Sequence, residues 1–317
     1  MRTLPKKESA YVSRFDRGVE GIKVFIMPGS YPNNPYRDIF TFCTQTWGYP
    51  TGNPLSRWKS TDPETRLRVV KAVMEKNSLP LSTEILNFTF YIEGISRWAF
   101  DQIVRSRIGV TFSGSGTGDT NRGDANFRIP ENIYKDEELL KEFKRVCLEC
   151  KEAYRKIVES GGDWVSARTI LPVSIEYQFQ MHVCFSTLQL MCSKRMCFAE
   201  FPDTVAFAWL LRKEMKKYFP FLANYLRPMC DFAGKCLYHK PYSDSECFGC
   251  LFRSCGRNKK TGIGPIYNYS TFDSLATNPS DIKKQLKIEI PESWDWKKYN
   301  SIDDLEGSDR ILFRSDD

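Results

Sequence analysis

A strand that runs straight into a helix is the feature of this sequence that most constrains its fold. Residues 85–94, ILNFTFYIEG, are rich in aromatic and β-branched residues and predict a strand, and residues 95–105 carry a helical pattern. The helix leads to Arg105 and Arg107, and then to the small-residue segment FSGSGTG at 112–118. Arginine offers a rigid fork of donors, and small residues let backbone approach a ligand closely. This junction therefore suits a phosphate-bearing partner.

Most of the other hydrophobic patterns are helical. A short strand is expected within residues 20–27, and residues 167–195 predict a buried helix after Pro172. Further helices are expected over residues 36–47, 61–76, 136–160 and 203–218. Together these elements predict an α+β (α/β) fold with a central mixed sheet flanked by long helices.

The chain divides into three predicted parts. Residues 1–228 carry the strand and helix patterns and form the predicted core. Residues 229–257 change to short cysteine-bearing turns, and residues 258–317 form a polar, charged extension. Because the extension contains the aromatic segment WDWKKY at 294–299, we expect it to dock on the core.

Composition excludes several classes of protein. The 317 residues are 41% hydrophobic, which is enough for one large core or two moderate ones. The net charge of +7 comes from 46 basic and 39 acidic residues that are scattered along the chain, so we expect anionic ligands but no nucleic-acid polymer. No apolar run is long enough to span a membrane, and the N-terminus lacks a signal-peptide pattern, so a cytoplasmic protein is expected.

The cysteines need a separate explanation. There are eleven, and an odd number without a signal peptide argues against a disulfide framework, which leaves metal ligation, burial or reactivity. Five lie within helical patterns, where a free cysteine is usually a small buried hydrophobe. These five are Cys147, Cys150, Cys184, Cys192 and Cys197. His182, within the predicted buried helix, is expected to be a hydrogen-bonded core histidine.

A second group of cysteines has metal-ligand spacing. Cys236 and His239 form one pair separated by two residues, and Cys247 and Cys250 form another. Two such pairs can wrap around one tetrahedral ion, so they predict a structural zinc site. Cys230 and Cys255 are spare ligands, and an iron–sulfur cluster held by these two with Cys247 and Cys250 is the alternative, as is the absence of any metal.

Several motifs occur in a recognisable order. They are Glu84 before the FTF of residues 88–90, Ser96 with Arg97, Gln102, the pair Arg105 and Arg107, Ala167 and Arg168 before Leu171 and Pro172, and Arg195. In order and spacing they resemble the flavin-dependent thymidylate synthases over roughly residues 20–225. The resemblance implies a homotetramer with active sites between subunits. It also implies transfer of a one-carbon unit from methylenetetrahydrofolate to C5 of deoxyuridylate, with FAD that is reduced by NADPH.

The resemblance also implies roles for single residues. Arg195 would polarise the pyrimidine ring, and the nucleotide would be held by Gln102, Arg105, Arg168 and Ser115. The flavin would be contacted by Glu84, Arg105, Ser106 and Arg107. A purely structural role remains open for Arg168, as a cap or ion pair, and for Arg195, at the end of a helix.

Departures from the family pattern leave the reaction open. Ser106 stands where the family has a histidine between its two arginines, and FSGSGTGDTNRG lacks the family's loop arginine and tyrosine. Arg122, a few residues further on, is a candidate to reach back toward a phosphate. The chain is expected to make thymidylate, or to methylate or hydroxymethylate another pyrimidine nucleotide such as deoxycytidylate, or to bind nucleotides without turnover.

Overall fold

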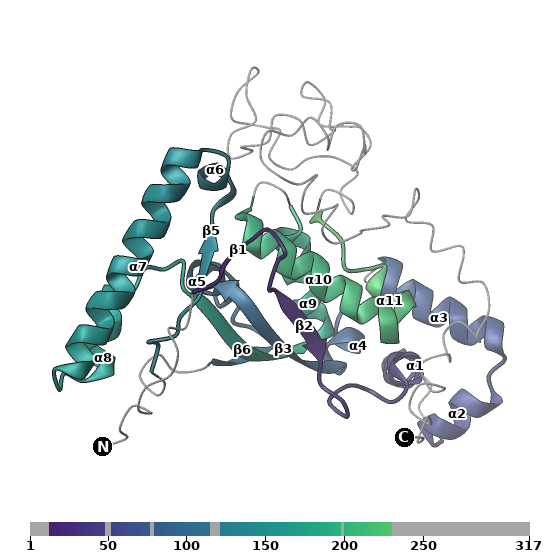
Figure 1. Cartoon of the computed structure of the whole chain (residues 1–317). Helices are drawn as coiled ribbons and strands as arrows, with labels where there is room; N and C mark the ends of the chain where they lie inside the picture. The colour runs from purple at the N-terminus through teal and green to yellow at the C-terminus, as the bar shows by residue number, and fades with distance from the viewer. Residues whose placement is uncertain (1–12, 48–51, 77–78, 115–120, 198–199, 230–317) are drawn as a thin grey trace, which may run out of the picture.

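The structure is a computed structural model that describes residues 13–47, 52–76, 79–114, 121–197 and 200–229 (Figure 1). The described helices are α1 (Pro35–Thr46), α2 (Pro54–Ser60), α3 (Pro63–Lys76), α4 (Leu81–Glu84), α5 (Arg97–Ile103), α6 (Glu131–Tyr134), α7 (Glu137–Glu159), α8 (Trp164–Ala167), α9 (Phe185–Arg195), α10 (Pro202–Tyr218) and α11 (Pro220–Ala223), with a 3-10 helix η1 at Arg168–Ile170. The strands are β1 (Phe15–Arg17), β2 (Lys23–Ile26), β3 (Asn87–Ser96), β4 (Val110–Gly114), β5 (Phe127–Ile129) and β6 (Glu176–Cys184). The cysteine-rich part and the extension lie beyond residue 229, outside the described residues.

Two sheets carry the strands. The main sheet has the order β2-β3-β6-β4 and is antiparallel throughout, while β1 and β5 form a separate parallel pair. The α+β class is confirmed, but the two strand directions lie in different sheets instead of one mixed sheet. Strand β3, the predicted strand, is central and pairs with both β2 and β6.

The segment after Pro172 corrects one prediction. Residues 176–184 form strand β6, and helix α9 begins only at Phe185, so the prediction of one buried helix was wrong. The sequence EYQFQMHVC alternates polar and apolar residues, and Phe179, Met181 and Val183 are buried in the described core. A period of two favours a half-buried strand, and this signal outweighs the overall apolar content.

One face of the main sheet is covered by helices and forms the core. Helices α5, α9 and α10 pack against β2, β3 and β6, and the apolar face of these strands is buried beneath them (Figure 1). The opposite face carries exposed Gln178, Gln180 and His182. The expectation that His182 lies in the core was therefore wrong: its Nδ1 lies 2.9 Å from Thr89 Oγ1 on the neighbouring strand.

The helix predictions are confirmed to within a few residues for α1, α3, α5, α7 and α10. Caps explain the agreement for two of them, since Asn34 accepts a hydrogen bond at the start of α1 and Asp136 accepts two at the start of α7. Helix α7 runs along one side of the molecule beside β5 (Figure 1). Across the described residues, no helix has the length and apolar character that crossing a membrane requires.

Candidate functional site

Three arginines from separate parts of the sequence line one pocket. Arg97, Arg122 and Arg168 surround a cavity of about 260 Å³ whose remaining wall is mostly apolar. That wall consists of Thr169, Leu171, Pro172, Val173 and Ile175. We call this cavity the arginine pocket. Guanidinium groups on an apolar surface can give forked, charge-assisted hydrogen bonds to a phosphate or carboxylate.

The start of α5 fixes the arginine pocket. Its first N–H groups, those of Arg97 and Trp98, donate to the carbonyls of Ile175 and Val173, at 2.9 and 3.1 Å. These bonds satisfy donors that a helix N-terminus leaves open, and they hold the segment after Pro172 against α5. Arg168 precedes that segment, on the single turn η1, and is thereby placed beside Arg97.

Tyr177 orients two of the three guanidinium groups. The Arg97 guanidinium carbon lies 5.0 Å from the centre of the Tyr177 ring, and that of Arg122 lies 5.9 Å from it. Attraction to the ring face stabilises both cations without neutralising them. Arg97 is also paired with Asp101 at 3.0 Å, and the Arg122 main-chain N–H donates to the Tyr154 hydroxyl at 3.0 Å.

Arg195 lies in a different group. Its Nη1 pairs with Glu200 at 2.6 Å, and its Nη2 donates to the main-chain carbonyl of Gln102 at 2.6 Å. The side chain is only 12% exposed. Arg195 therefore ties the end of α9 to the end of α5 and satisfies a carbonyl in the last turn of α5, where helices leave acceptors open. Gln102 and Arg195 are therefore neighbours in the structure.

The segment Arg105–Gly109 follows α5 and lies at the start of α9. The Thr187 hydroxyl donates to the Ile108 carbonyl at 2.7 Å, and the Cys184 N–H donates to the Gly109 carbonyl at 2.9 Å. Gly109 has a φ of +66°, and a Cβ there would overlap Cys184 Sγ and Thr187 Oγ1. Only glycine fits this close approach. Arg105 and Arg107 are exposed, as is Glu84 at the end of α4.

The residues predicted for the site thus fall into two groups in one chain. Arg168 lies in the arginine pocket at the beginning of α5, whereas Gln102, Arg105 and Arg195 lie around its end. Ser106 donates its main-chain N–H to the Ile103 carbonyl in the turn that closes α5. Ser115 lies outside the described residues, and so do Cys230, Cys236, His239, Cys247, Cys250 and Cys255. The zinc site stays a prediction.

A polar cavity of about 360 Å³ adjoins the arginine pocket and shares Arg122 with it. Arg14, Glu93 and Glu176 line it, and none of them was predicted. Burial raises the pKa of the Glu176 carboxyl, while the Arg14 guanidinium, 3.1 Å away, acts in the opposite direction. No local motif marks these residues, because contacts between distant segments place them together.

Comparison with known proteins decides the family. The sequence model described as "Thymidylate synthase complementing protein" matches residues 31–221, which is more than half of the chain. The chain belongs to this family. A flavin-dependent thymidylate synthase from Pyrococcus furiosus is 29% identical over 174 residues, which cover 54% of this chain and 70% of the relative. One from Geobacter sulfurreducens is 38% identical over 94 residues, which cover 29% and 40% of the two chains.

A solved structure shows the same fold. The "UMP/dUMP methylase PolB from Streptomyces cacaoi bound with 5-Br dUMP" matches with a TM-score of 0.55 and 14% identity. The match covers 68% of this chain and 96% of the other. Family and fold together indicate a flavin-dependent thymidylate synthase-like methyltransferase.

Proposed function

We propose that this protein transfers a one-carbon unit from methylenetetrahydrofolate to C5 of a pyrimidine deoxynucleotide, with dUMP as the first-choice substrate and dTMP as the product. NADPH is the proposed reductant and FAD the proposed cofactor, which would supply the redox chemistry when bound. Family membership supports this reaction class. The observation that carries the proposal is the convergence of Arg97, Arg122 and Arg168 on one pocket, because a nucleotide monophosphate needs such a cluster of forked cationic donors.

The arginine pocket would hold the phosphate of the nucleotide. Arg168 is one of the residues that the resemblance assigns to holding the nucleotide, and Arg97 lies beside it on the first turn of α5. Arg122 lines the same cavity. We propose that it compensates for the arginine that the loop lacks.

The residues present fit a flavin dinucleotide in their chemistry. Arg105 and Arg107 are exposed donors in the segment after α5, and that segment bonds to the start of α9 through the Gly109 carbonyl. Cationic side chains suit a pyrophosphate. Glu84, at the end of α4, is the carboxylate that the resemblance assigns to the same cofactor.

Substitution in the arginine pocket tests the proposed phosphate site. Arg168→Ala is expected to weaken dUMP binding about ten- to hundredfold, because one charge-assisted hydrogen bond contributes about 1.5–3 kcal/mol. Arg122→Ala is expected to weaken dUMP binding as well. Both variants should bind uridine, which has no phosphate, as tightly as the unmodified protein does. Isothermal titration calorimetry measures these affinities.

Two controls make this test specific. Arg145→Ala removes an exposed cation on α7 that lines neither cavity and pairs with Glu142 and Glu149, so it should leave dUMP affinity unchanged. Unchanged dUMP affinity in both Arg168→Ala and Arg122→Ala would refute the phosphate site. A flavin spectrum in the purified protein and the mass of the product formed from labelled methylenetetrahydrofolate test the reaction itself.

Another pyrimidine nucleotide is the second candidate substrate. The loop that departs from the family pattern directly precedes Arg122 in the sequence, and Arg122 lines the arginine pocket. The structural neighbour is named as a methylase of both UMP and dUMP. The product-mass assay with UMP, dCMP and dUMP side by side distinguishes these substrates, and it also separates methyl from hydroxymethyl transfer. A protein that binds nucleotides but gives no product would be the third, catalytically silent outcome.

A further inference from the structure

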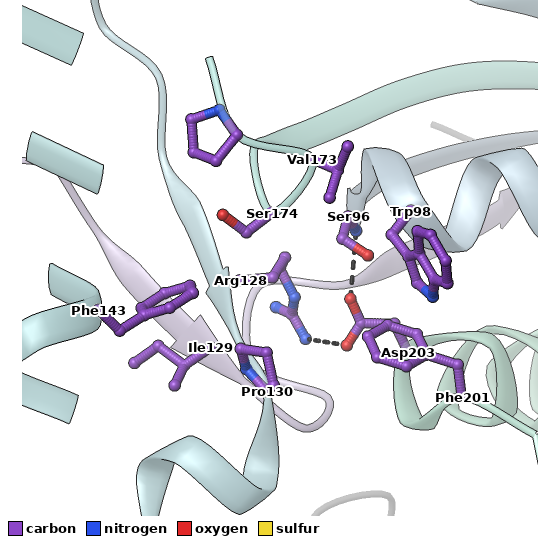
Figure 2. Close-up of a pocket in the computed structure, with 11 residues that line it drawn as sticks. Ser96, Trp98, Arg128, Ile129, Pro130, Phe143, Val173, Ser174, Phe201 and Asp203 are labelled. Atoms are coloured by element: carbon purple, nitrogen blue, oxygen red, sulfur yellow. Dashed lines mark hydrogen bonds and ion pairs between the residues drawn. The ribbon is translucent and has the colours of Figure 1, made fainter. Parts of the chain in front are cut away.

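A third cavity shares Pro172 and Val173 with the arginine pocket but has a different character. Its volume is about 280 Å³, and its lining is mostly apolar. Three aromatic side chains from different parts of the chain line it (Figure 2). Trp98 comes from α5, Phe143 from α7, and Phe201 from the residue before α10. We call this cavity the aromatic pocket. The proposed reaction uses none of these three side chains.

The floor of the aromatic pocket holds a buried ion pair. Arg128 of β5 and Asp203 of α10 are 2% and 4% exposed, and Arg128 Nη2 lies 3.4 Å from Asp203 Oδ1 (Figure 2). Asp203 also accepts a hydrogen bond of 3.2 Å from the Ser96 N–H. Burying both charges is costly unless their hydrogen-bonding groups are satisfied, so each group in this pair needs a partner.

One donor of this pair has no partner within the described residues. Arg128 Nη2 also donates to the Gly18 carbonyl at 2.6 Å, and Nη1 donates to the Glu20 carbonyl. Nε is buried without a hydrogen-bond acceptor in the described part of the chain. A buried guanidinium N–H without an acceptor is destabilising, and an acceptor that enters the pocket would remove this penalty.

The charges at the floor select the kind of ligand. Because Asp203 already balances Arg128, an anion would be repelled by the carboxylate and a cation by the guanidinium. A neutral group with an acceptor atom is repelled by neither charge. The walls add a preference for a flat ring, since Trp98 and Phe201 lie edge to face at 6.3 Å and offer aromatic surface to stack on.

We propose that the aromatic pocket binds a neutral heteroaromatic ring that carries a carbonyl, with the ring against Trp98 and Phe201 and the carbonyl oxygen accepting from Arg128. Uracil, pterin and nicotinamide rings share this chemistry. The cavity has the size of a single ring system, not of a whole dinucleotide. The test of this site is independent of the phosphate site, because the ring probes below carry no phosphate.

Ring binding to the full-length protein tests this proposal. Uridine, 6-methylpterin and nicotinamide are each titrated and followed by saturation-transfer NMR, and at least one is expected to bind. Trp98→Ala is expected to weaken the binding of that ring at least about fivefold, which is the lower end of the affinity lost with a stacking aromatic side chain. Leu55→Ala is the matched control, because Leu55 is 51% exposed, Trp98 is 45% exposed, and Leu55 lies on α2 outside this pocket.

The hydrogen bond is tested without removing the buried ion pair. In protein labelled with ¹⁵N-arginine, the Nε–H signal that disappears in Arg128→Lys is expected to shift when the ring is added. If no ring binds, if Trp98→Ala binds it as tightly as Leu55→Ala does, or if the Arg128 signal stays in place, the proposal is wrong. Binding of uridine alone would identify the ring as a nucleobase, whereas binding of the pterin or nicotinamide would identify a cosubstrate ring.

Discussion

Contacts between distant segments hold several arginines in the described part of the chain. Arg97 and Arg122 face one aromatic ring, Tyr177, and the buried Arg128–Asp203 pair joins β5 to α10. At this scale the arginines of the candidate site divide by environment. The arginine pocket keeps its cations near solvent, where a ligand can reach them, while Arg195 is bonded to Glu200 and to the Gln102 carbonyl.

Glu176 gives the protein a predictable pH dependence. Burial raises the pKa of its carboxyl above the ordinary value of 4.5, so at intermediate pH the folded state binds more protons than the unfolded state. The stabilising effect of protonation is complete below about pH 4.5 and is lost as pH rises through the raised pKa. As pH rises from about 4.5 through the raised pKa, the free energy of unfolding measured with urea should fall less in Glu176→Gln than in the unmodified protein.

A control separates this effect from the general acid response. Glu159 is exposed at the end of α7, so Glu159→Gln should follow the unmodified protein across the same pH series. The predicted sign of the pH dependence is wrong if the free energy of unfolding of the unmodified protein rises steadily from pH 4.5 to 7 and that of Glu176→Gln follows it.

Among the elements, β3 and α5 together organise the candidate site. Strand β3 contains an irregularity between Glu93 and Ile95, where the register with β6 shifts by one residue. A bulge of this kind bends the strand and re-aims the residues that follow it. Beyond it, the Ser96 hydroxyl accepts from the Ala99 N–H and caps α5, so the strand passes directly into the helix that begins with Arg97.

Gly94 in the bulge is expected to tolerate no side chain. Its φ is +78°, and a Cβ would overlap the carbonyl oxygen of Gly21 in the adjacent turn. Gly94→Ala should therefore lower the free energy of unfolding by more than about 1 kcal/mol. Chemical denaturation followed by circular dichroism measures this change.

Gly29 is the matched control for the bulge. It also has a positive φ, of +74°, but nothing lies within 4 Å of an added Cβ. Gly29→Ala reports the cost of backbone conformation alone, so it should destabilise less than Gly94→Ala. Equal losses in the two variants would mean that the contact with Gly21 does not matter.

At the scale of the whole molecule, the predicted active-site residues lie in two separate places. Helix α5 separates the arginine pocket from the group around Gln102 and Arg195, and the polar face of β6 carries exposed side chains. A complete site formed from one chain would need the two groups to approach each other. The homotetramer that the resemblance implies would solve this by combining the two groups from different subunits, and this assembly stays a prediction.

Subunit complementation tests the shared site. Arg105→Ala and Arg168→Ala should each be inactive alone, whereas co-expressed chains that carry one substitution each should recover part of the activity, because some interfaces then contain both intact groups. Arg122→Ala with Arg168→Ala is the matched pair that should not recover, since both residues line the same pocket of one chain. Light scattering measures whether the protein forms a dimer or tetramer in solution. If the pair Arg105→Ala and Arg168→Ala recovers no activity, the shared site is contradicted.

The sequence by itself determined the family, the helices with strong caps, and the strand that runs into α5, because these depend on short-range patterns that the chain carries locally. The strand at 176–184 was missed although its alternation is visible, since apolar content was weighted above period. Only the tertiary structure decided which arginines share a pocket. Arg97, Arg122 and Arg168 meet because α5 bonds to the segment at 173–175 and Tyr177 attracts two of them, and no local pattern encodes such long-range contacts.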